Sequence, residues 1–314
     1  MELVNQPALP SRIVCLGEGM VELAPRGSRW DVRYGGDTLN TAIHLARLHH
    51  DVAYLTALGG DPFAGPMRAA WAGEGIDVST VLSVPARCTG LYAISLDPRG
   101  ERTFAYWRGE SAARALFAAE GIEAALAAGR EADLLFFSLI SLAILDDSGR
   151  RDLLELAGEV RSRGGKVAFD GNYRPALWDE PATARRWRDL AIAASDFGFP
   201  SLDDEQRLGG AASADDVRAA WQALGCGEVV VKLGPDGVAL PDGTILAPSA
   251  RLEPVDTSGA GDACDAGYLA ARLRGAGPEQ AARDGQRLAG WTVMRQGAIP
   301  PVEDAAPYAE MAAQ

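Results

Sequence analysis

The chain has 314 residues, of which 47% are hydrophobic and 23% are charged, which fits one large α/β domain with an appendage or two domains. Its formal net charge of −13 argues against nucleic acid and against an anionic membrane as partners. The four cysteines are widely spaced and form no CxxC motif, which favours a reducing compartment and disfavours a zinc site. No apolar run is long enough to cross a bilayer and the N-terminus lacks the features of a secretion signal, so we expect a cytoplasmic protein.

Strand-like and helix-like stretches alternate along most of the chain. Short apolar runs predict buried strands at residues 12–17, 52–61, 132–140, 166–174 and 227–234. Segments with helical periodicity lie between them, among others at residues 38–50, 62–75 and 150–165. This order predicts an α/β fold with a doubly wound, mainly parallel sheet flanked by helices. Such a fold binds its ligands beyond the carboxyl ends of the strands.

Two stretches, residues 20–36 and 89–109, have no helical pattern. The second one predicts a hairpin whose turn is DPRG at residues 97–100. We interpret both stretches as a small β-sheet lid. The lid is inserted into a single α/β domain of residues 11–314, which follows an N-terminal tail of residues 1–10.

The segment VDTSGAGDACDAGYLA, residues 255–270, has the features of an anion site followed by a helix. Gly259 and Gly261 let backbone N–H groups turn toward one point, and a helix start adds unpaired N–H groups. Asp262 would lie beside a phosphate held there, which makes sense if this carboxylate takes the proton of an attacking hydroxyl. The segment therefore predicts phosphoryl transfer to an alcohol. An acidic residue that only complements a helix N-terminus is the alternative.

Several motifs are similar to those of the ribokinase-like (PfkB) carbohydrate kinases. DTSGAGD, residues 256–262, resembles the C-terminal signature of that family, and GGDTLNTAIHLARL, residues 35–48, resembles its N-terminal glycine motif. The motifs TGLY, GERTFAYWR, SLISLAIL, DGNYRPALW and LDDE resemble the branch that phosphorylates 2-keto-3-deoxygluconate.

The resemblance covers nearly the whole chain. It implies a ribokinase-like fold with a β lid and phosphorylation of the 6-hydroxyl of 2-keto-3-deoxygluconate. ATP and Mg²⁺ are the implied cofactors, Asp262 is the implied general base, and 2-keto-3-deoxy-6-phosphogluconate and ADP are the implied products.

The same resemblance assigns the residues of the sugar site. The implied substrate contacts are Gly36, Asp37, Asn40, Tyr92, Tyr106, Arg108, Arg174 and Asp262. Asp37 also suits a helix N-cap, and both tyrosines also suit the apolar face of a lid. Two arginines at one cleft of an acidic protein indicate an anionic ligand, which a sugar acid is and ribose is not. Which arginine meets the carboxylate stays open, as does the choice between gluconate- and galactonate-derived keto acids.

The nucleotide site is likewise assigned by resemblance. Its residues are Asn172, Arg174, Ser201, Lys232, Gly234, Gly237, Ser258, Gly259, Ala260 and Gly261. Asp204 is the candidate for the Mg²⁺ shell, but LDDE departs from the family's NxxE, and an acidic first turn of a helix is the alternative. Asp256 holds a monovalent cation or orders the loop, and the pattern does not decide between these roles. Ala298 stands where some relatives have an acidic residue that closes the substrate site.

Three other functions are compatible with parts of the pattern. A kinase for fructose or ribose shares the fold but has no need of two arginines in the cleft. A non-catalytic sugar-acid sensor keeps the pocket but has no need of the base Asp262. A dehydrogenase lacks support, because no GxGxxG follows the first strand. The resemblance also implies a homo-oligomer, a dimer or higher, in which lid strands pair between subunits.

Overall fold

The computed structural model describes residues 12–96 and 102–313, so the predicted turn at residues 97–100 lies outside the described residues. The main sheet has the strand order β12-β11-β10-β9-β1-β4-β5, and β6 also pairs with β4. These pairs are all parallel. The strands are β1 (Arg12–Leu16), β4 (Asp51–Gly59), β5 (Ile76–Asp77), β6 (Val81–Val84), β9 (Leu134–Ser138), β10 (Lys166–Asp170), β11 (Phe197–Phe199) and β12 (Glu228–Val229). The prediction of a doubly wound, mainly parallel sheet is confirmed.

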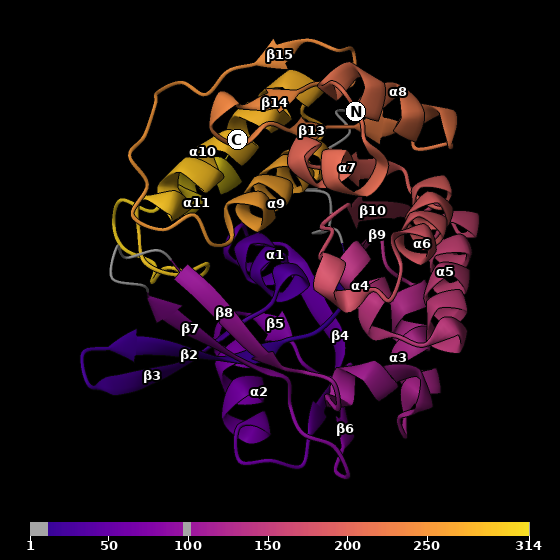
Figure 1. The fold of residues 1–314 in the computed structure, drawn as a ribbon, viewed down its shortest axis with the longest axis vertical. Helices are drawn as coiled ribbons and strands as arrows, with labels where there is room; N and C mark the ends of the chain where they lie inside the picture. Colours follow the sequence, from indigo (N-terminus) through magenta and orange to yellow (C-terminus); the bar gives the residue numbers. More distant parts are fainter. Residues whose placement is uncertain (1–11, 97–101, 314) are drawn as a thin grey trace, which may run out of the picture.

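Helices cover both faces of this sheet (Figure 1). One layer contains α1 (Asp37–Arg47), α2 (Ala64–Gly73), α9 (Ala260–Leu273), α10 (Pro278–Val293) and α11 (Tyr308–Ala312). The other contains α3 (Ile122–Arg130), α4 (Leu139–Ile144), α5 (Asp147–Ser162), α6 (Pro181–Ala193), α7 (Leu202–Gly209), α8 (Ala214–Ala223) and the short helix η1 (Ala112–Ala118). Along β1, Ile13 and Cys15 pack into the first layer and Val14 and Leu16 into the second. Burial on both faces explains the continuous apolar runs in the sequence.

A second sheet of four strands, which we call the lid, extends from one side of the main body (Figure 1). Its order is β3-β2-β7-β8, with β2 and β7 parallel and the two outer pairs antiparallel. The strands are β2 (Met20–Arg26), β3 (Arg29–Gly35), β7 (Leu91–Leu96) and β8 (Arg102–Trp107). The register places Tyr92 opposite Tyr106 on one face of the lid, and it places Trp30, Val32 and Trp107 on the other face.

Three predicted strands end well before their predicted bounds, and the one predicted at residues 166–174 stops at Asp170. In residues 132–140 the strand stops at Ser138 and α4 begins, because Ser138 and Ser141 cap each other's backbone N–H groups in a capping box. The run at residues 227–234 is divided between two sheets. Its first part is β12, whereas β13 (Val231–Lys232) forms a separate sheet with β14 (Val238–Ala239) and β15 (Ile245–Leu246).

Two further short helices, η2 (Pro175–Leu177) and η3 (Gly234–Asp236), follow β10 and β13. In the described parts of the chain, every helix is too short or too polar to cross a membrane.

Candidate active site

A cleft of about 1740 Å³ lies between the lid and the N-terminal end of α9, where the parallel strands end. Every residue that the sequence predicts for substrate, nucleotide or metal lines this cleft. The residues come from strand ends, from the lid and from three helix starts, so they are far apart in the sequence. Their position is the one that a doubly wound sheet favours for a ligand. The cleft is therefore the candidate active site, and the role of each residue remains a prediction.

The glycine loop before α9 has the conformation that an anion site needs. Gly259 is the N-cap of α9 and has a left-handed φ of 71°. A Cβ at this position would also lie 2.5 Å from the Cβ of Ala298, so only glycine fits. Helix α9 then starts at Ala260, and its first backbone N–H groups have no partner within the helix. Gly261 and Asp262 follow in the first turn, beside these groups.

Asp262 is held as a buried carboxylate at the start of α9. Its Oδ2 accepts a hydrogen bond from Asn40 Nδ2 at 2.7 Å, which links α9 to α1. Burial raises the pKa of Asp262, the nearby charge of Asp37 raises it too, and the Asn40 hydrogen bond opposes this, so that the pKa is about 7. A carboxyl group with such a pKa can accept a proton at neutral pH and release it again.

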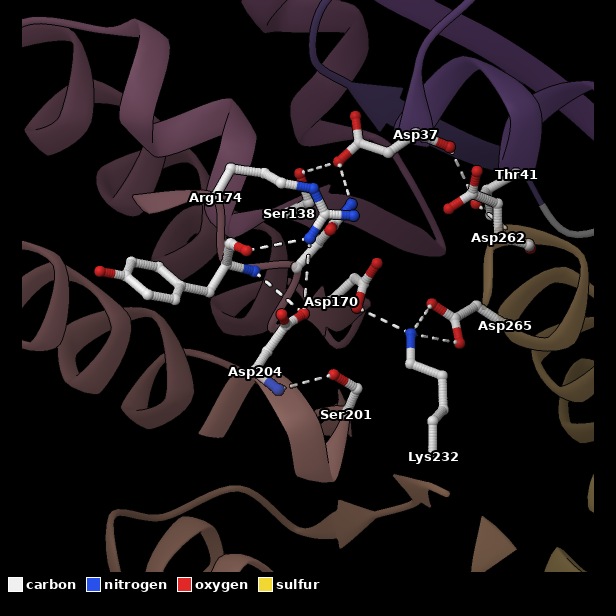
Figure 2. A network of polar contacts seen from close by, with 12 residues as sticks. Asp37, Thr41, Ser138, Asp170, Arg174, Ser201, Asp204, Lys232, Asp262 and Asp265 are labelled. Carbon is white, nitrogen blue, oxygen red and sulfur yellow. Dashed lines mark hydrogen bonds and ion pairs between the residues drawn. The ribbon is translucent and has the colours of Figure 1, made fainter. Parts of the chain in front are cut away.

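Asp37 lies at the start of α1 and is held by two polar side chains (Figure 2). Ser138 Oγ donates to its Oδ2 at 2.5 Å, and Asn172 Nδ2 donates to the same oxygen at 3.1 Å. The alternative of Asp37 as an N-cap is wrong, because Gly36 is the N-cap and Asp37 is the first helical residue. Asn172, which was predicted to contact the nucleotide, thus donates a hydrogen bond to Asp37, which was predicted to contact the sugar. Ser138 was missed, although its place at the end of a strand was a signal.

Arg108 has a buried acidic partner that the sequence did not reveal. Its guanidinium pairs with the carboxylate of Glu18, and the two side chains are 10% and 1% exposed. A Cβ on Gly90 would collide with Glu18 Oε1, which explains the glycine in the TGLY motif. The buried guanidinium is therefore fixed at the base of the lid by an ion pair.

Tyr92 and Tyr106 lie on the lid face that borders the cleft. The Tyr92 hydroxyl donates to Glu22 on the neighbouring strand, and the two tyrosine rings lie 5.8 Å apart. A Cβ on Gly35 would lie 2.5 Å from the Tyr92 hydroxyl oxygen, so glycine is needed there. Burial raises the pKa of Tyr92, and the charge of Glu22 raises it further, so this phenol stays protonated. Glu22 is a second acidic residue of the cleft that the sequence did not reveal.

Arg174 and Asp204 approach each other at the opposite side of the cleft. Arg174 Nη1 donates to the Tyr173 carbonyl at 2.9 Å and lies 3.6 Å from Asp204 Oδ2. Ser201 is the N-cap of α7, and its Oγ accepts from the Asp204 backbone N–H at 3.1 Å. The acidic-first-turn alternative for Asp204 therefore describes its position, while its carboxylate still borders the cleft.

The remaining loops complete the wall around the glycine loop. Asp256 accepts hydrogen bonds from Ser258 N at 3.0 Å and from Gly297 N at 2.6 Å, so it orders the loop and joins it to the C-terminal segment. Gly234 and Gly237 have φ values of 60° and 104° in the turn after β13. A Cβ on Gly237 would collide with the Leu246 carbonyl oxygen, so close backbone packing and the turn both require glycine there.

Comparisons with known proteins define the class to which this fold and cleft belong. The family model described as pfkB family carbohydrate kinase matches residues 11–305. The chain is 40% identical over 305 residues to the 2-dehydro-3-deoxygluconokinase of Escherichia coli strain K12, a match that covers 94% of this chain and 99% of that protein. It is 38% identical over 301 residues to the 2-dehydro-3-deoxygluconokinase of Dickeya dadantii strain 3937, covering 93% and 97%. A fructokinase double mutant from Vibrio cholerae O395, solved in fructose, ADP and potassium ion bound form, matches with a TM-score of 0.81 at 26% identity and covers 98% and 99%.

The chain belongs to the pfkB family of carbohydrate kinases. It is therefore a kinase with a ribokinase-like fold, as the motifs at both ends of the sequence predicted. The two relatives described above, both named 2-dehydro-3-deoxygluconokinase, match it over nearly their whole length.

Proposed function

We propose that this kinase transfers the γ-phosphoryl group of ATP to the 6-hydroxyl of 2-keto-3-deoxygluconate, which is also called 2-dehydro-3-deoxygluconate. The observation that carries this proposal is the position of Asp262, a buried carboxylate directly after the Gly259–Gly261 loop in the cleft below the lid. Identity to two 2-dehydro-3-deoxygluconokinases supports the choice of substrate. The products would be 2-keto-3-deoxy-6-phosphogluconate and ADP.

Asp262 has the geometry and the basicity for the proton transfer. The 6-hydroxyl gives its proton to the Asp262 carboxylate while its oxygen bonds to the γ-phosphorus. The bond from that phosphorus to the bridging oxygen breaks, and its electron pair leaves with ADP. The unpaired N–H groups at the start of α9 stabilise the charge on the transferred group, and Asn40 keeps the carboxylate oriented.

Mg²⁺ would neutralise charge on the ATP phosphates when it is bound. Asp204 suits its shell chemically, because Mg²⁺ prefers oxygen ligands and this carboxylate borders the cleft. Among the described residues, no group of three or more His, Cys, Asp or Glu side chains is arranged to hold a metal ion. An ion bound mostly through ATP phosphates and water needs no such group. Potassium is bound in the fructokinase structure. As a further part of the proposal, this chain also binds a monovalent cation.

The remaining predicted contacts divide between the two ligands. The residues that we assign to binding of the sugar acid are Gly36, Asp37, Asn40, Tyr92, Tyr106, Arg108 and Arg174. The residues that we assign to the nucleotide are those from Ser258 to Gly261, Gly234 and Gly237 of the turn after β13, and Asn172, Ser201 and Arg174. Lys232 was also predicted for the nucleotide, but its ammonium group donates to Asp170 and Asp265, so we assign it to neither ligand. Closure of the lid over the sugar would exclude water and limit hydrolysis of ATP.

The outer face of the lid supports a homo-oligomer as part of the proposal. Trp30, Val32 and Trp107 lie on that face and are 52%, 58% and 62% exposed. Such large apolar side chains on one exposed sheet favour contact with another protein surface. A second copy of the lid, in a dimer or a higher assembly, is the partner that we propose. We also propose a cytoplasmic location, where ATP is supplied as the phosphoryl donor.

The substrate is tested by ADP release with Mg·ATP. The panel is 2-keto-3-deoxygluconate, its galactonate-derived epimer, fructose, ribose and adenosine, each at the same concentration. We expect turnover on the keto acids alone. Turnover on fructose or ribose in preference would contradict the substrate, and keto-acid binding without any ADP would identify a sensor.

A further inference from the structure

A buried ion triad lies beneath the glycine loop (Figure 2). Lys232 Nζ donates to Asp170 Oδ1 at 2.8 Å, and it lies 3.0 Å and 3.2 Å from the two carboxylate oxygens of Asp265. Asp170 and Asp265 are buried. The ammonium group therefore points to two carboxylates within the protein.

The triad joins three elements that define the reactive end of the cleft. Asp170 is the last residue of β10, Lys232 is the last residue of β13, and Asp265 lies on α9, one turn after Asp262. A Cβ built on Gly261 would lie 3.5 Å from Lys232 Nζ. The ammonium group thus lies directly against the first turn of α9. It connects that turn to the edge of the main sheet.

The residue type at this position is unusual for this chain. The sequence has 30 basic residues, and Lys166 and Lys232 are its only lysines. An ammonium group is compact and directs three donors from one atom, whereas a guanidinium group is planar and larger. Three donors on one atom suit a site in which two carboxylates lie around that atom. Arginine stands at the 28 basic positions other than Lys166 and Lys232.

Lys232 is the cation among the charged groups that influence Asp262. Asp37 on α1 and Asp170 on β10 raise the pKa of Asp262, whereas Lys232 lowers it. Asp265 on the same helix and Tyr92 on β7 also interact with this carboxylate. Burial lowers the pKa of Lys232, but the charges of Asp170 and Asp265 raise it above its ordinary value, so the lysine stays charged. Without this cation, three carboxylates would lie together in a buried region.

We propose that Lys232 is a positioning residue for phosphoryl transfer, which fixes the first turn of α9 through Asp170 and Asp265 and keeps Asp262 in its ionised form. This proposal rests on the proposed role of Asp262 as the general base. Replacement of Lys232 would leave the nucleotide pocket in place but would make the base harder to ionise. The effect would therefore appear in the pH dependence of the reaction as well as in its rate.

The test is the pH profile of kcat/KM for the sugar acid, at saturating Mg·ATP, in variants that change the charge of the triad. In Lys232→Met we expect the acidic limb to move up by about one pH unit, which is about a tenfold loss of kcat/KM on that limb. In Asp170→Asn we expect it to move down. In Lys232→Met/Asp170→Asn we expect a limb close to that of the wild type. Lys166→Met removes the other lysine, an exposed one paired with Asp196, and should leave the profile unchanged.

Shifts in the same direction for Lys232→Met and Asp170→Asn, or no shift in either, would overturn the proposal. If Lys232→Met alone does not fold, the double variant is compared with Asp170→Asn, and its limb should lie higher. The ¹³C signal of the Asp262 carboxylate, assigned with Asp262→Asn, follows the same titration without turnover. This signal separates a failure of the triad from a failure of the proposed substrate.

Discussion

The two sides of the cleft are built in different ways. On the α9 side, the ligand surface is mainly backbone: a left-handed Gly259 and the first turn of a helix that no side chain caps, with one buried carboxylate. On the lid side it is mainly side chains, with Arg108 paired to Glu18 and Tyr92 bonded to Glu22. The first side suits the phosphates of ATP, which are the same whichever sugar is bound. The second can change by substitution and suits the recognition of one sugar. We therefore expect chemistry and specificity to depend on different parts of the molecule.

Asp262→Asn should have the largest effect on the α9 side. The variant keeps the shape and the bond to Asn40 but removes the proton acceptor, so we expect kcat to fall by about 10²–10⁴-fold. KM for the sugar acid should change by no more than a few-fold, because the lid contacts remain. Steady-state kinetics at pH 8, where the wild-type carboxylate is ionised, measure both constants. A kcat within threefold of the wild type would show that Asp262 is not the base.

Gly259→Ala should have the next largest effect. The new methyl group meets Ala298 and the backbone must keep a φ of 71°, so the loop has to shift. Because the N–H groups then point away from the phosphate, we expect kcat to fall by about 10²-fold. Gly275→Ala, after the other end of α9 and also left-handed, is the matched control for backbone strain alone. Equal losses of activity in both variants would contradict the special role of the loop.

Arg108→Met should change specificity more than chemistry. Loss of one charged hydrogen-bonding partner of the sugar acid is worth about 1.5–3 kcal/mol, so we expect KM for the keto acid to rise about 10- to 100-fold. kcat should fall much less. Arg174→Met tests the second arginine, and the larger KM increase identifies the one that meets the carboxylate. Arg87→Met, whose partner Glu110 is exposed, should leave both constants unchanged.

The smallest expected effect is on stability as a function of pH. The folded pKa of Asp262 is about 7 and lies above the ordinary value of 3.8, so the folded state binds this proton more tightly than the unfolded state. The resulting stabilisation is complete below pH 3.8 and is lost as the pH rises through 7. Above pH 7, Asp262→Asn should therefore unfold at a higher temperature than the wild type. Its free energy of unfolding should be greater by no more than about 4 kcal/mol. Equal thermal stabilities at pH 5 and pH 8 would show that this carboxylate is not strained by burial.

The sequence predicted the parallel sheet because burial on both faces imposes apolar runs such as that of β1, which any reader of the pattern can find. The glycine loop could also be predicted from the sequence, because its residues are contiguous and local backbone conformation explains each of them. The ion pairs were not visible. Asp170 and Lys232 lie 62 residues apart, and neither segment of the sequence indicates that the other is its partner. The division of residues 227–234 between two sheets was hidden too, because a short apolar run does not reveal with which strands it pairs.

The separation of chemistry from specificity is tested most directly by kcat and KM for 2-keto-3-deoxygluconate in Asp262→Asn and Arg108→Met, measured side by side with Mg·ATP at pH 8. We expect Asp262→Asn to lose kcat at nearly constant KM, and Arg108→Met to raise KM while keeping most of kcat. The reverse pattern, or the same loss of kcat in both variants, would contradict a division of labour between α9 and the lid.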